Sequence, residues 1–152
     1  MTMQNALGSE IVAVGGVIDP DVTVASTVTS DWLDLGLFDQ AIAIVLAGTL
    51  GASATLAAKL EQADSAAGGN AKDITGKAIT NLTQASPDDS DKQAIINVRA
   101  EELDLANDFR FVRLSLTVGV ATSDVGGILL GVGARYGPAS DNDLASVAEI
   151  VN

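Results

Sequence analysis

The body of the chain is a succession of short apolar runs, each bounded by residues typical of turns. The runs are rich in Val, Ile and Leu, and several alternate apolar with polar residues, as a strand with one buried face does. They predict an all-β fold, an antiparallel β-sandwich that is jelly-roll-like and has about eight strands. The segments expected as strands are residues 11–18, 22–29, 41–47, 54–64, 73–82, 93–99, 108–119 and 126–136, and residues 32–39 are expected to form a short strand and a tight turn.

Turn residues set the expected connections between these strands. Asp19-Pro20-Asp21 predicts a turn between the first two strands, because proline fixes φ and aspartate side chains bond their own backbone. Residues 122–124 predict the turn of a hairpin between the last two strands. Residues 41–47 contain no polar side chain, which predicts a strand buried on both faces.

Two segments fit more than one structure. Residues 54–64, ATLAAKLEQAD, have the composition of a helix and the alternating pattern of a strand, and the two signals are equally strong in isolation. The neighbouring segments favour a strand. Residues 41–58 carry no charge, and their length approaches that of a membrane-spanning helix. Because residues 48–51 predict a turn at its centre, we expect no membrane span.

The two ends of the chain differ from the body. Residues 1–10, MTMQNALGSE, are expected to form a flexible arm, and they lack the basic residues of a signal peptide. Residues 11–137 form the sandwich domain, and residues 138–152 form a tail with a short C-terminal helix over residues 141–150. Asp141 or Asp143 is the expected N-cap of this helix. Its apolar residues follow a helical spacing: Leu144, Val147, Ala148 and Val151.

The chain is strongly acidic. It has 8 Lys and Arg residues against 20 Asp and Glu residues, a net charge of −12. Such a charge favours solubility and repels phosphate backbones, so we expect no direct binding to nucleic acid.

The residue types exclude most catalytic chemistry. With no cysteine and no histidine, the chain has no thiol nucleophile, no Cys or His zinc ligand and no imidazole base. The acidic segments 85–91 and 141–143 lack the spacing of an EF-hand and indicate a solvated loop and a helix cap. Adjacent Glu101 and Glu102 point to opposite faces of a strand, which does not suit glycoside hydrolysis. We therefore expect no enzymatic activity, no cofactor and no metal.

Three side chains stand out as contact candidates or as unusual strand residues. Trp32 is the single tryptophan. We expect its side chain to lie in the core, and the alternative is that it inserts into a pocket of a partner protein. Arg110 and Arg113 lie in an apolar strand, where their parity places them on opposite faces. We expect Arg110 to reach solvent or the acidic residues 101–108, and Arg113 to form a salt bridge between subunits.

Four stretches of the sequence resemble a known family. Residues 32–41, WLDLGLFDQA, are similar to the strand, glycine, aromatic, acidic and apolar opening of small β-sandwich proteins encoded beside tailed-phage capsid genes. Residues 54–65 resemble a strand and turn of that family, and FRFVRLSLTV at 109–118 is similar to its "R-Y-V-R-v-x-l-T-V" strand. Gly126 to Gly133 resembles the closing strand. The resemblance covers residues 30–137. It departs at 61–65, where the family has "E-S-D-D-G", and near Pro87.

The resemblance implies a capsid decoration, or cement, protein. Such a protein is made in the host cytoplasm, forms homotrimers and binds the outer surface of the virion, where it bridges subunits of the major capsid protein. The arm is a candidate capsid contact, with Trp32 and Arg113 as candidate contacts in the sandwich. Two alternatives remain: another virion β-sandwich (tail, fibre base or head completion) and a carbohydrate- or cell-surface-binding module. The arm residues that we propose as contacts are Met1, Thr2, Met3, Gln4 and Asn5.

Overall fold

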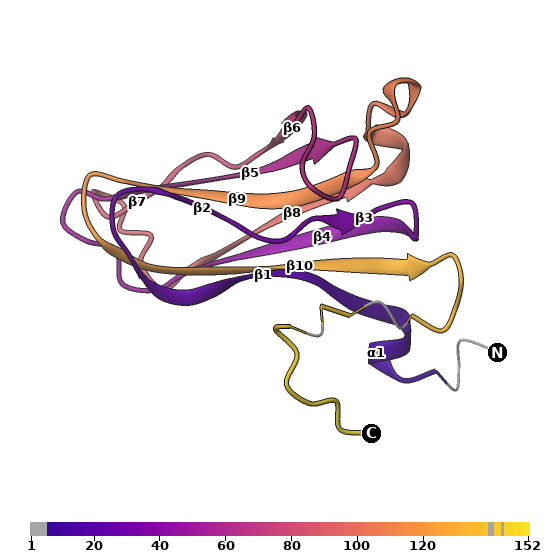
Figure 1. Ribbon diagram of the computed structural model, residues 1–152. Coiled ribbons are helices and arrows are strands. Elements are labelled where there is room, and N and C mark those ends of the chain that lie inside the picture. The colour runs from indigo at the N-terminus through magenta and orange to yellow at the C-terminus, as the bar shows by residue number, and fades with distance from the viewer. Residues whose placement is uncertain (1–5, 140–141, 144) are drawn as a thin grey trace.

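The computed structural model describes residues 6–139, 142–143 and 145–152, which fold into two antiparallel sheets stacked face to face (Figure 1). The four-stranded sheet has the order β1 (Val12–Thr23), β10 (Ser123–Ala134), β4 (Phe38–Ala47) and β8 (Gln93–Arg99). The six-stranded sheet has the order β2 (Thr27–Thr29), β9 (Phe111–Gly119), β5 (Thr55–Ala63) and β6 (Lys72–Ala78). Its two remaining strands are short: β3 (Leu33–Asp34) pairs with β9, and β7 (Leu82–Thr83) pairs with β5.

The chain crosses between the sheets at most connections. Eight strands, four in each sheet, take the arrangement of a jelly roll, which confirms the predicted sandwich. The expected number of about eight strands was too low. The two additional strands, β3 and β7, are only two residues long and give no separate signal in the sequence. The segment 54–64 is strand β5, and the uncharged residues 41–58 hold β4, a connection and the start of β5. Among the described residues, no helix is long and apolar enough to cross a membrane.

The predicted turn at Asp19-Pro20-Asp21 is wrong. β1 runs through it without interruption, and its register on β10 shifts between Ile18 and Asp21. A bulge of this kind accommodates a proline because the extra residue donates no hydrogen bond to the ladder. The chain changes sheets after Thr23, and β2 pairs with β9 instead of with β1.

Two other strand boundaries differ from the prediction. The segment 73–82 is divided into β6 and β7, and Gly76 within β6 has a φ of +76°. β10 begins at Ser123, so the turn before it falls at residues 120–122 instead of 122–124.

The predicted C-terminal helix is not present in the described residues of that segment, which hold only a turn at Ala145 and Ser146. The tail is instead fixed to the edge of β1: Asp143 N donates to Val14 O, and Val14 N donates to Asn142 Oδ1. A helix of about ten residues has little stability of its own in water, so the predicted spacing alone does not suffice to form one. At the other end, Gly8 to Glu10 of the expected arm lie in the one-turn helix α1 (Gly8–Ile11), and Glu10 O accepts from Ala139 N.

The core lies between the two sheets and is built from small and medium aliphatic side chains. Leu56 and Leu60 of β5 and Leu114 and Leu116 of β9 are fully buried, and they face the inner side of β4 and β10. Phe38 packs where β10 has Gly131: a Cβ at Gly131 would lie 2.8 Å from the Phe38 ring. Gly131 therefore permits close packing of Phe38 against β10.

Candidate functional site

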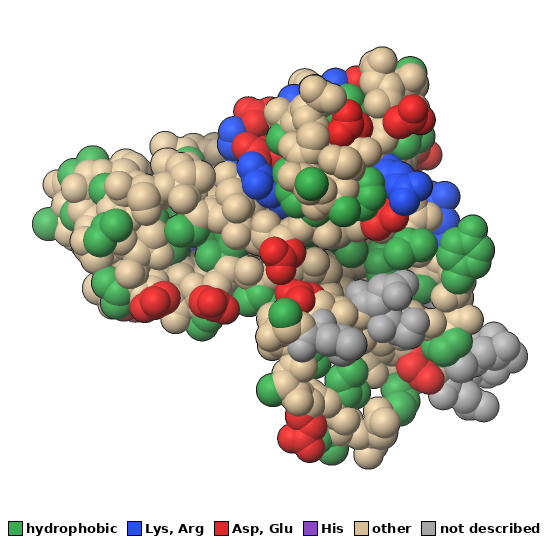
Figure 2. Space-filling model, in the orientation of Figure 1, with side chains coloured by type: hydrophobic (Ala, Val, Ile, Leu, Met, Phe, Trp, Pro, Cys, Tyr) green, Lys and Arg blue, Asp and Glu red, His purple; other side chains and the backbone are tan. Residues whose placement is uncertain are grey.

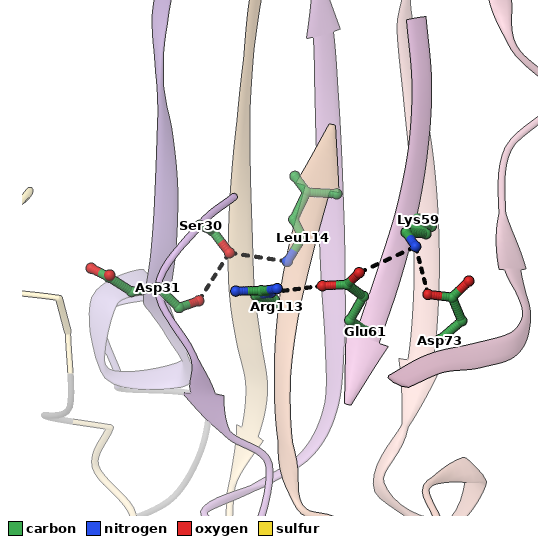
Figure 3. A network of polar contacts seen from close by, with 7 residues as sticks. All are labelled: Ser30, Asp31, Lys59, Glu61, Asp73, Arg113 and Leu114. Atoms are coloured by element: carbon green, nitrogen blue, oxygen red, sulfur yellow. Dashed lines mark hydrogen bonds and ion pairs between the residues drawn. The ribbon is translucent and has the colours of Figure 1, made fainter. Parts of the chain in front are cut away.

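The outer face of the six-stranded sheet carries a chain of charged side chains that crosses three strands (Figure 3). Arg113 of β9 lies opposite Glu61 of β5, and its Nε donates to Glu61 Oε2 over 2.7 Å. Lys59 Nζ lies 3.2 Å from Glu61 Oε1 and 2.6 Å from Asp73 Oδ1 on β6. The hydrogen bond to Asp73 raises the pKa of Lys59 above its ordinary 10.5, although partial burial opposes the shift. The network is complete within one chain.

Trp32 lies on this outer face, so its expected position in the core is wrong. Its side chain is half-buried, with the Arg113 guanidinium 4.5 Å from the ring centre. A Cβ at Gly68 would approach the indole nitrogen to 2.7 Å, so the loop after β5 also packs against the ring. Arg113 points away from the core on β9, and its role between subunits stays a prediction.

A buried serine fixes the chain just before Trp32. Ser30 is 5% exposed, and its Oγ accepts from Leu114 N and donates to Asp31 O (Figure 3). Ser30 N also donates to Leu114 O, which extends the pairing beyond the end of β2. These bonds hold the Trp32 backbone beside Arg113.

Arg110 meets one of its two expected alternatives, since its side chain reaches solvent and is 57% exposed. Its ion pair is with Asp34 and not with the acidic residues 101–108. Its Nη2 lies 2.8 Å from Asp34 Oδ2, because Leu35 N donates to Arg110 O and brings the two loops together. The guanidinium also lies 5.1 Å from the centre of the Phe111 ring.

The acidic residues that follow β8 are paired with lysines of β6. Lys77 Nζ lies 2.8 Å from Glu102 Oε1, and Lys72 Nζ pairs with Asp104. The bond from Lys77 holds the pKa of Glu102 below its ordinary 4.5, and the bond from Lys72 holds the pKa of Asp104 below 3.8. In Figure 2, basic and acidic side chains are intermixed over the upper part of the molecule, where Figure 1 shows β5, β6 and β9.

The outer face of the four-stranded sheet is apolar. Cross-strand registers place Val17 opposite Ile128, Ile128 opposite Ile44, and Ile44 opposite Ile95. These four residues form a row across β1, β10, β4 and β8, here called the apolar row. Val14, Leu130 and Ile42 form a second row beside it on three of the strands.

β4 turns its larger side chains away from the core. Ala41, Ala43 and Val45 face inward and are buried, whereas Ile42 and Ile44 face outward and are half-buried. Leu46 is 45% exposed and Ile95 on the neighbouring strand is 55% exposed. The prediction that residues 41–47 are buried on both faces is therefore wrong for the isolated chain. The sequence signal that could have predicted this apolar outer face was the alternation of small and large apolar residues along residues 41–46.

The remaining predicted contacts, Met1, Thr2, Met3, Gln4 and Asn5, lie outside the described residues. The described residues contain no cluster of three or more acidic side chains arranged to hold a metal ion. The loop 85–91 is largely exposed, as expected, and Asp89 accepts from Thr83 N and bonds Lys92.

No family model matches the sequence, and no curated protein matches it. Solved structures share its arrangement at low similarity. The structure of broad bean stain virus is 10% identical with a TM-score of 0.42, over 94% of this chain and 98% of that one. The infectious bursal disease virus Gx strain is 11% identical with a TM-score of 0.38, over 84% of this chain and 33% of that one.

A carbohydrate-related structure is similar to the same degree. The CBM22-1–GH10 modules of Clostridium thermocellum xylanase 10B, complexed with xylohexaose, are 11% identical with a TM-score of 0.37. The match covers 87% of this chain and 28% of that one. Similarities this low assign the chain neither to a family nor to a function.

Proposed function

We propose that the protein is a non-enzymatic structural protein of a tailed-phage virion. It decorates the outer surface of the head and stabilises the shell by bridging subunits of the major capsid protein. The resemblance of residues 30–137 to capsid decoration proteins suggests this role, and with it a homotrimer. A jelly roll by itself is used by viral capsid domains and by lectins, so the fold does not choose between them.

The observation that carries the proposal is the orientation of β4. A strand that buries Ala41, Ala43 and Val45 while presenting Ile42, Ile44 and Leu46 leaves its larger apolar area for another surface. Full burial of an exposed aliphatic side chain contributes about 1.5–3 kcal/mol, and the part of each of these side chains that is still exposed contributes a share of that. The apolar row repeats this across all four strands, so a partner that covers the sheet buries several such side chains together. Apolar faces suit permanent contacts between structural subunits.

The other outer face fits a carbohydrate-binding module poorly. Sugar rings stack on exposed aromatic faces, but Arg113 and the loop at Gly68 already pack against the Trp32 ring. Tyr136 is 79% exposed, and it stands alone at the end of β10. A glycan array without a hit is the expected result.

The experiment that tests the proposed function measures binding to heads assembled from the capsid protein of the same phage genome. We expect the wild-type chain to bind in a saturable number of copies and Ile44→Lys to lose most of this binding, since a lysine would be buried there. Thr75→Lys, on exposed β6 of the opposite sheet, introduces the same charge and is expected to bind normally. Equal binding of both variants would contradict the role of the apolar face, and no binding of the wild type would contradict decoration.

A further inference from the structure

We propose that β8 pairs edge to edge with β8 of a second copy of this chain, about a two-fold axis. The two four-stranded sheets then join into one sheet of eight strands. This contact is separate from the capsid contact proposed above, and it requires no other protein.

The outward edge of β8 has free hydrogen-bonding groups. Ala47 N donates to Lys92 O, so the alternating pattern of an antiparallel ladder turns Ala94, Ile96 and Val98 toward β4. The N–H and C=O groups of Gln93, Ile95, Asn97 and Arg99 therefore point away from the sheet. Arg99 N donates to Glu102 Oε2, and within the described part of the chain no hydrogen bond reaches the main chain of the other three from that side.

The other sheet edges are protected. The edge of β1 is bonded to the C-terminal tail through Val14. β6 carries Lys72 and Lys77 and contains a glycine with positive φ. Both features disfavour pairing of an edge strand with another chain. β2 is only three residues long. β8, with the sequence QAIINVR, has no proline or glycine and has a single charge at its end.

One antiparallel register makes this edge complementary to itself. With Ile95 opposite Ile95 of the second copy, Gln93 of each chain lies opposite Asn97 of the other. Residues whose N–H and C=O groups point outward then meet as hydrogen-bonded pairs, because 93, 95 and 97 share one parity. The centre contributes an apolar pair and the flanks contribute two amide pairs. A shift by two residues would place Ile95 opposite a polar side chain.

The pairing also extends the apolar row. Ile95 ends the row at the open edge and is its most exposed member. Across the two-fold axis the row continues through Ile95 and Ile44 of the second copy, so the continuous apolar face doubles in width. If the chain also forms trimers, the same contact links one trimer to the next.

The test uses charges of opposite sign at the position on the axis. Ile95→Asp and Ile95→Lys each place like charges opposite one another in a homodimer, whereas a mixture of the two places Asp opposite Lys. We expect native mass spectrometry and sedimentation to show a two-fold loss of mass for each variant alone. An equimolar mixture is expected to regain the wild-type mass as a mixed species. Circular dichroism checks that each variant is folded, which is expected because Ile95 is 55% exposed.

Val22→Asp and Val22→Lys provide the matched control, since Val22 is 62% exposed on β1 at the other side of the sheet. Both are expected to keep the wild-type mass. The proposal is overturned if wild type and Ile95→Asp have the same mass. It is also overturned if the mixture of Ile95 variants forms no mixed species.

Discussion

Arg113 and Glu61 lie directly opposite each other on neighbouring strands, and Arg113 Nε donates to Glu61 Oε2 over 2.7 Å. Both side chains are largely shielded, with 27% and 14% of their areas exposed. The guanidinium also covers Trp32. This pair therefore contributes to the stability of the single chain, whatever contacts Arg113 makes with a neighbour.

Replacement of Arg113 by Ala is expected to lower the free energy of unfolding by about 1–2 kcal/mol, since Glu61 loses one of its two cationic partners and Trp32 loses its cover. A double-mutant cycle with Glu61→Ala should give a coupling of about 1 kcal/mol by denaturant titration. The exposed pair Arg99–Glu101, at 3.5 Å, is the control and should couple by less than about 0.5 kcal/mol. Additive effects at Arg113 and Glu61 would show that the pair contributes nothing.

The ion pair between Lys72 and Asp104 should make part of the stability depend on pH. Its hydrogen bonds hold the pKa of Asp104 below 3.8 in the folded chain, so the stabilisation is present above that pH and is lost as pH falls through the lowered pKa. Asp104→Asn should therefore be less stable than wild type at pH 7, and this difference should shrink below pH 3.8. Asp19→Asn, in the exposed bulge of β1, removes the same charge without breaking an ion pair of the described residues and should cost less stability at pH 7 than Asp104→Asn. A difference for Asp104→Asn that is constant with pH would contradict the assignment.

Gly131→Ala should be destabilising, because its Cβ would lie 2.8 Å from the buried ring of Phe38. Overpacking of this kind costs about 1–3 kcal/mol, which thermal or denaturant unfolding measures readily. Gly8→Ala is the control, since nothing lies within 4 Å of its added Cβ. Equal stability of the two variants would show that Phe38 yields without cost.

The sequence was sufficient to predict the two-layer β architecture because strand parity and turn residues are local signals. The parity of Arg113 and the strand nature of residues 54–64 followed from the same signals. The path of β1 did not, since Asp19-Pro20-Asp21 has the residues of a turn, and only pairing with β10 makes it a bulge. The Trp32 position depended on Ser30 and Gly68, which are distant from Arg113 in sequence, and the apolar row depended on three cross-strand registers.

The N-terminal arm remains a candidate capsid contact. Removal of residues 1–5 should weaken binding to heads while leaving the unfolding transition unchanged, because helix α1 and its bond to Ala139 are retained. In a matched variant, residues 1–5 are replaced with Gly and Ser, so the arm keeps its length. This variant separates the effect of the arm's sequence on head binding from the effect of its length. Unchanged occupancy of the heads by the shortened chain would contradict a role for the arm.

The most direct test of the proposed function is a cryo-EM reconstruction of the virion whose genome encodes this chain. We expect many copies of the sandwich on the outer surface of the head. In each copy, the sheet of β1, β10, β4 and β8 faces the shell, and the capsid protein covers Ile44 and Ile128. A head without this density, or a sandwich bound with that sheet exposed to solvent, would contradict the proposed function.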